Sequence, residues 1–288
     1  MPHVDEMTLI VIDAALQVAG VLVFTGAAVR MIRRGEWRDP IDTRDFNRRG
    51  PDLFQLLAVF VFYILLTSAL QQLQDRSARI GAELGSHAWH VAQILNCSAQ
   101  LVTVGLMMYL LHGAAIFPKR AGNPGLGTII LLAMGTTLVV FVISGVQVQA
   151  VQTVWFWIAP RETPPVHDVL QAIDHSAWGR WGVIQLVIAA IVIAPLAEEF
   201  FFRGMILGVL WTYIGKAWPA VILSGVAFGL IHLKQPQAVL PLASMGIILG
   251  YVRMRYRSLS LCVLVHALFN ARTILIVLCN PEFSRCAW

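Results

Sequence analysis

Eight apolar runs, each about as long as a membrane-spanning helix, follow one another along this chain of 288 residues. A transmembrane α-helix needs about 20 mainly apolar residues to cross the hydrocarbon core of a bilayer. The predicted spans are 8–29, 53–71, 90–115, 126–150, 181–212, 217–234, 237–255 and 259–279. We therefore predict an all-α polytopic membrane protein, a bundle of about eight transmembrane helices.

The composition agrees with this fold class. Hydrophobic residues make up 58% of the chain and charged residues 13%, whereas a soluble domain carries about 25% charged residues. The formal net charge of +5 is concentrated in short segments between the apolar runs. This pattern is typical of membrane topology signals rather than of nucleic-acid binding, so no nucleic-acid partner is expected.

The basic residues also predict an orientation. Segment 30–49 contains seven arginines, and the positive-inside rule puts such a segment in the cytoplasm. Alternation of the spans then places the basic turns at 119–120, 216 and 253–257 on the same side. Both termini are predicted to lie outside. Because the chain is short and has few loops, we expect the cytoplasmic membrane of a bacterium.

The chain divides into three predicted parts. Residues 1–160 are N-terminal membrane helices of unknown role. Residues 181–279 contain the ionisable side chains that could take part in a reaction. Between them, residues 161–180 carry apolar side chains at helical spacing, with acidic residues and histidines among them. This pattern predicts an amphipathic helix at the membrane surface. An ordinary amphipathic connector is the alternative.

Several ionisable side chains lie inside the predicted fifth, sixth and eighth spans. Five of them are the candidate functional groups Glu198, Glu199, Arg203, His232 and His266. Such groups are costly at membrane depth and usually mark functional sites. A lone membrane histidine often only hydrogen-bonds a neighbouring helix, but five ionisable groups in three nearby spans indicate a site.

Helical spacing separates the two glutamates. Glu199 and Arg203 are four residues apart, so they share a helix face and are predicted to form an ion pair. Glu198 points about 100° away from that face. We therefore predict that Glu198 is a general base and that Glu199 and Arg203 support it.

The distances along the chain predict that these groups meet. Glu198 and His232 each lie 17 residues from Gly215, in the predicted turn, so antiparallel neighbours would place them at equal depth. His266 and Asn270 share one face of the last span at a similar depth. Such a site suits hydrolysis of an acyl bond. Glu198 would take a proton from a water oriented by His232, and His266 and Asn270 would donate to the oxyanion.

Three motifs occur in order on these spans. They are Glu-Glu-x-x-x-Arg at 198–203, Phe-x-x-x-His at 228–232 and His-x-x-x-Asn at 266–270. In this order and apolar context they resemble the CPBP intramembrane proteases. That family includes the CAAX prenyl endopeptidases of eukaryotes and the bacteriocin-processing or immunity (Abi) proteins of bacteria. The resemblance covers about residues 180–275.

The resemblance implies an intramembrane endopeptidase that hydrolyses peptide bonds of membrane-associated substrates. It assigns water activation to Glu198 and His232, and the oxyanion site to His266 and Asn270. The full set of implied catalytic residues is Glu198, Glu199, Arg203, His232, His266 and Asn270. Phe228, one helical turn before His232, is the expected substrate-binding residue. The expected partners are the lipid bilayer and a membrane-embedded or lipidated peptide or protein.

Metal use is left open by these residues. The chain lacks H-E-x-x-H, the motif that puts two zinc ligands on one helix face. We predict that no cofactor is needed. The alternative is zinc held by Glu198, His232 and His266.

Two other functions remain open. The chain could be a non-catalytic membrane scaffold or immunity protein that retains the fold. It could also be a proton-coupled transporter, since buried Glu and His side chains relay protons. A transporter predicts inverted repeats with matching broken helices, and the sequence shows a break only at Pro195.

A G-x-x-x-G motif at Gly246 and Gly250 lies in the predicted seventh span. This spacing permits close contact between two helices. We predict packing within the bundle rather than dimerisation.

Overall fold

The computed structural model describes residues 6–35, 41–44, 46, 50–78, 87–113, 125–158 and 179–279. Throughout these ranges the regular elements are helices, and seven helices are long and apolar enough to cross a membrane. The predicted class, a polytopic helical bundle, is confirmed. Nearly all of the predicted surface connector, 161–178, lies outside the described residues.

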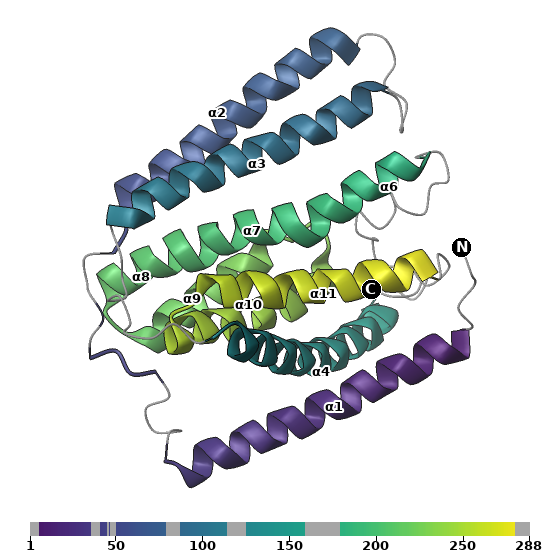
Figure 1. Cartoon of the computed structure of the whole chain (residues 1–288), viewed down its shortest axis with the longest axis vertical. Coiled ribbons are helices and arrows are strands. Elements are labelled where there is room, and N and C mark those ends of the chain that lie inside the picture. The colour runs from purple at the N-terminus through teal and green to yellow at the C-terminus, as the bar shows by residue number, and fades with distance from the viewer. Residues whose placement is uncertain are drawn as a thin grey trace.

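Four long helices precede the segment that carries the motifs. They are α1 (Glu6–Arg33), α2 (Leu53–Ala78), α3 (His87–Gly113) and α4 (Leu126–Ile158). Figure 1 shows α2 and α3 side by side along one flank of the bundle, and α1 beside α4 along the other. The helices of residues 179–279 lie between these two pairs.

The fifth span, residues 179–214, changes its hydrogen-bonding pattern several times. It consists of α6 (Gly179–Ile188), the π-helical segment η2 (Ala189–Ile193), α7 (Ala194–Glu199), the π-helical segment η3 (Phe200–Ile206) and α8 (Leu207–Ile214). The span ends at Gly215, whose φ of 65° is left-handed. A residue without a Cβ adopts this conformation at little cost.

The predicted sixth span is shorter than expected. α9 (Ala217–Leu230) has 14 residues and so rises about 21 Å, less than the roughly 30 Å hydrocarbon core. A turn over residues 231–235 follows, because Gln235 precedes Pro236 and adopts a non-helical conformation. Of the eight predicted spans, seven are thus long enough to be candidate membrane spans and α9 is the short one, and His232 lies in this turn rather than within a helix.

Two helices complete the chain, α10 (Pro236–Tyr256) and α11 (Leu259–Cys279). α9 and α10 form a hairpin that brings the chain back to the end of the bundle where α9 began. α1 begins and α11 ends at one common end of the bundle (Figure 1). This arrangement agrees with termini on the same side of the membrane.

The hairpin of α9 and α10 is packed through glycines. A Cβ built on Gly225 would lie 2.5 Å from the backbone nitrogen of Ile247, and one on Gly246 would lie 2.8 Å from the Cα of Gly225. Gly250 faces Val221 in the same way, at 3.2 Å. The prediction that the G-x-x-x-G motif packs within the bundle is confirmed.

The main core lies where α4, η3, α9, α10 and α11 meet. Phe202 and Phe228 are almost fully buried, and their rings contact edge to face at 5.1 Å between centroids. Other buried members are Ala133, Val140, Phe141, Met245, Leu249, Val252, Leu261, Cys262, Val265 and Phe269. This core holds the polar residues of the motifs against a rigid apolar support.

Candidate active site

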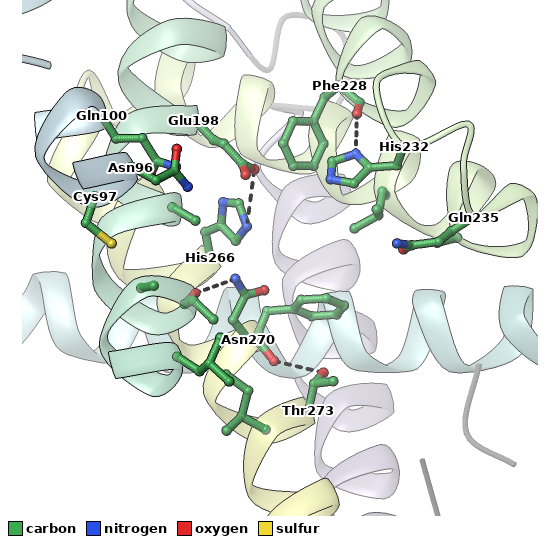
Figure 2. Close-up of a pocket in the computed structure, with 18 of the residues that line it drawn as sticks. Asn96, Cys97, Gln100, Glu198, Phe228, His232, Gln235, His266, Asn270 and Thr273 are labelled. Atoms are coloured by element: carbon green, nitrogen blue, oxygen red, sulfur yellow. Dashed lines mark hydrogen bonds and ion pairs between the residues drawn. The ribbon is translucent and has the colours of Figure 1, made fainter. Parts of the chain in front are cut away.

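A cavity of about 350 Å³ lies among α3, the fifth span, the turn after α9, and α11 (Figure 2). Its wall contains Glu198 from α7, His232 from the turn, and His266 and Asn270 from α11. Phe228 of α9 also lines it. Residues that are up to 72 positions apart in the sequence thus border one space, at the place where the motifs predict a site.

Glu199 and Arg203 form a fully buried ion pair beside this cavity. The Nη1 atom of Arg203 donates to Oε1 of Glu199 at 2.8 Å, and both side chains are 0% exposed. The predicted pairing is therefore present. Arg203 also donates from Nη2 to the carbonyl oxygen of Gly246 at 3.2 Å, and its Cζ lies 4.6 Å from the ring centroid of Phe228. These contacts tie the fifth span to α9 and α10.

His266 connects the two glutamates. Its Nδ1 lies 2.9 Å from Oε1 of Glu199, and its Nε2 lies 3.9 Å from Oε2 of Glu198. An ionised carboxylate only accepts hydrogen bonds, so Nδ1 of His266 carries a proton. The Glu198 side chain is 29% exposed, whereas Glu199 is enclosed. Glu198 is thus the carboxylate that faces the cavity.

The position of Asn270 depends on the break in the fifth span. In η2 the backbone N–H of Ala194 donates to the oxygen of Ala189, five residues earlier. The next such bond would join residue 195 to Ala190, but Pro195 has no N–H to donate. The side chain of Asn270 donates from Nδ2 to this carbonyl oxygen of Ala190 at 2.8 Å. A backbone acceptor left open by a proline therefore holds Asn270 at the cavity.

The second π-helical segment is satisfied by side chains from other helices. Ser224 of α9 donates its hydroxyl to the carbonyl oxygen of Phe202 at 3.1 Å. Arg253 of α10 donates to the carbonyl oxygen of Arg203 at 3.4 Å. π-helical turns often occur at functional sites, and these bonds allow one to persist beside the ion pair.

The turn after α9 fixes one ring nitrogen of His232. Its Nδ1 lies 2.9 Å from the carbonyl oxygen of Phe228. Because a carbonyl oxygen only accepts, Nδ1 is the donor, and neutral His232 keeps a lone pair on Nε2. The ring of Phe228 contacts His232 at 5.3 Å and His266 at 5.7 Å between centroids. Phe228 thus separates and orients the two imidazoles.

The described residues do not assemble an evident metal-binding group. Within that part of the chain, no three His, Cys, Asp or Glu side chains are arranged to hold a metal ion. Glu198, His232 and His266, the alternative zinc ligands, border the cavity without forming such a group. That the reaction needs no metal stays a prediction.

An ion pair that the sequence reasoning missed lies near the cavity. Arg272 of α11 contacts Asp13 of α1, and its Cζ lies 4.8 Å from the ring centroid of Phe141 in α4. The pair joins α1 and α4 to α11 next to Thr273, which lines the cavity. The available signal was Arg272 itself, a charged residue inside the last apolar run.

The sequence reasoning also missed the contribution of α3. Gln93, Asn96 and Gln100 line the cavity together with Cys97. The sequence contains an indication of this polar face. Three amide side chains at spacings of three and four residues share one face of an otherwise apolar helix.

The fold and the site define a multi-pass helical membrane protein with a buried carboxylate and histidine cluster beside an internal cavity. Residues 180–272 match the family model described as Type II CAAX prenyl endopeptidase Rce1-like. This segment is about a third of the chain and contains all three motifs, so the resemblance to the CPBP/CAAX protease family is confirmed there. No curated protein and no solved structure matches the chain.

Proposed function

We propose that this protein is an intramembrane endopeptidase that cleaves membrane-associated substrates with a water molecule activated by Glu198. The observation that carries the proposal is the buried series Arg203, Glu199 and His266, which leads to Glu198 at the cavity wall. The match of residues 180–272 to a family of endopeptidases supports the same class of reaction.

Glu198 is the proposed general base. Glu199 is already committed to Arg203 and His266, whereas Glu198 is open to the cavity. A water molecule there would transfer a proton to Glu198 while its oxygen attacks the carbonyl carbon of the peptide bond. His232 would orient this water, because its Nε2 can accept a hydrogen bond while Nδ1 is held by the backbone.

His266 and Asn270 are the proposed donors to the oxyanion. Nδ1 of His266 is held by Glu199, so Nε2 is the ring atom that faces Glu198 and the cavity. With a proton on Nε2, His266 would donate to the developing oxyanion. Asn270 uses one amide hydrogen for Ala190 and has a second to donate. Collapse of the intermediate would break the C–N bond, with the proton on Glu198 passing to the leaving amine.

The test is cleavage of membrane peptides by the purified protein in liposomes. Glu198→Gln removes the base but keeps the shape of the side chain, so we expect kcat/KM to fall by about 10²–10⁴-fold. Asp52→Asn is the matched control, because Asp52 is an exposed carboxylate at the start of α2. It should cleave at the wild-type rate.

Two results would contradict the proposal. If Glu198→Gln cleaves as fast as wild type, Glu198 is not the base. If wild type cleaves nothing but moves protons across the liposome membrane, the transporter alternative holds. If it shows neither cleavage nor proton transport, the scaffold alternative is favoured. A parallel reaction with a zinc chelator tests metal use, and we expect unchanged cleavage.

A further inference from the structure

We propose that Gln93, Asn96 and Gln100 of α3 bind the main chain of an extended substrate segment beside the bond to be cut. We call these three residues the amide ladder. The location of the cut bond rests on the proposed function, but binding of an extended peptide does not. The ladder lies outside residues 180–272, the segment that matches the endopeptidase family.

The ladder presents unused hydrogen-bonding groups to the cavity. Its three side chains line the same space as Glu198 and His266, and Figure 2 shows Asn96 and Gln100 on α3 at its edge. None of the three forms a hydrogen bond to another residue in the described ranges. Asn96 is exposed and Gln93 and Gln100 are half-buried, so their side chains are accessible to a ligand. An amide offers two donors and an acceptor, which suit a polar ligand in the cavity.

The dimensions of the ladder suit an extended chain. Residues 93 and 100 are seven positions apart on a helix, which is about 10.5 Å along its axis. An extended strand rises about 3.3 Å per residue, so the ladder spans about three substrate residues. A helical substrate already satisfies its own backbone groups and has nothing to offer the amides. We therefore infer that the bound segment is unwound.

Apolar side chains from other helices line the same cavity. They include Leu242 of α10, Phe269 and Ile274 of α11, and Phe228 of α9. Apolar groups of this kind suit the side chains of a membrane-derived peptide, while the amides suit its main chain. The amides and the apolar residues together favour one occupant, an apolar peptide in extended form.

The ladder is held between two attachments of α3. On its C-terminal side, Val104 and Met107 pack against Met205 of η3 in a buried cluster. On its N-terminal side, Nδ1 of His90 lies 2.6 Å from Oε1 of Gln185 in α6. The ladder residues are thus held along the cavity by contacts on either side of them, as a preorganised binding surface requires.

Cys97 provides a reporter of occupancy. It lines the cavity between Asn96 and Gln100 and is not in a disulfide. The experiment measures the rate at which a maleimide modifies Cys97 in the Glu198→Gln protein, with Cys279 and Cys286 replaced by alanine. The probes are a synthetic apolar decapeptide and the same peptide N-methylated at alternate main-chain nitrogens.

We expect the decapeptide to slow the modification of Cys97, and the N-methylated peptide to do so more weakly. In the variant Gln93→Met, Asn96→Leu, Gln100→Met the affinity for the decapeptide should fall by about fivefold for each hydrogen bond lost. The two peptides should then bind equally. Ser98→Ala is the control on the exposed face of α3, where Ser98 bonds only within its own helix.

The inference is overturned if the ladder variant still distinguishes the two peptides, or if N-methylation never matters. A lower midpoint of thermal unfolding with unchanged binding would also overturn it, by assigning the amides a packing role. Cleavage by the wild-type chain is measured separately. Peptide binding without cleavage would contradict only the proposed function. If the ladder variant cleaves as fast as the wild-type protein, only this inference is contradicted.

Discussion

At the scale of single residues, the two adjacent glutamates are distinguished by burial. Glu199 is enclosed and bonded to a guanidinium and an imidazole, while Glu198 reaches the cavity. A buried charge depends on its partner, because the cost of removing it from water is recovered only through that partner. Two adjacent residues of the same type therefore differ in role. Glu199 is structural, and Glu198 is the proposed general base.

Arg203→Met should show this difference directly. The substitution leaves Glu199 buried without its cation, so we expect a loss of about 3–5 kcal/mol in the free energy of unfolding. Glu198→Gln should change this free energy little, because Glu198 is partly exposed and lacks a guanidinium partner in the described residues. Denaturant unfolding in detergent micelles measures both variants. Equal stabilities for the two would contradict the assignment of Glu199 and Arg203 as support.

At the scale of elements, the fifth span carries the site because its helix is irregular. The π-helical segments η2 and η3 free backbone carbonyls, and Asn270, Ser224 and Arg253 use them as acceptors. Sequence reasoning expected Pro195 to disturb the helix. The structure accommodates the proline through the π-helical turn that precedes it, and the chain remains helical to residue 214.

Pro195→Ala should separate stability from activity. The new N–H would donate to a carbonyl oxygen of η2 and compete with Asn270 for Ala190. We expect an unchanged or higher midpoint of thermal unfolding and a lower kcat. In a double-mutant cycle with Asn270→Ala, the double variant should lose less activity, expressed as free energy, than the sum of the two single losses. Strict additivity would show that Pro195 does not act through Asn270.

At the scale of the whole molecule, basic residues gather at one end of the bundle. Phe46 in the arginine-rich segment contacts Trp211 of α8 at 5.4 Å between ring centroids, and the Cζ of Arg257 lies 4.9 Å from the Phe46 ring. Lys216 follows α8 in the same region of the fold. By the positive-inside rule this end is the proposed cytoplasmic face.

Single cysteines in an otherwise cysteine-free protein test this orientation. A membrane-impermeant maleimide applied to intact cells should modify a cysteine at Thr8, near the start of α1. A cysteine at Lys216 should react only after the membrane is permeabilised. Both positions are exposed, so access to the reagent depends on the side of the membrane. The reverse labelling pattern would show that the start of α1 lies in the cytoplasm.

Much of this protein could be predicted from local patterns. Apolar run length predicted the helical membrane class, because a helix must satisfy its own backbone groups in lipid. The spacing of Glu199 and Arg203 predicted their ion pair, because residues four apart share a helix face. The three ordered motifs predicted which side chains border the cavity.

Other features depended on contacts between distant segments. The length of α9 and the position of His232 in a turn were missed, because an apolar run does not show where a helix ends inside a bundle. The anchoring of Asn270 on Ala190, the pairing of Arg272 with Asp13 and the place of α3 at the cavity were missed for a related reason. Hydrogen bonds of this kind join residues 80 or more positions apart, and only the packing of the helices brings such residues together.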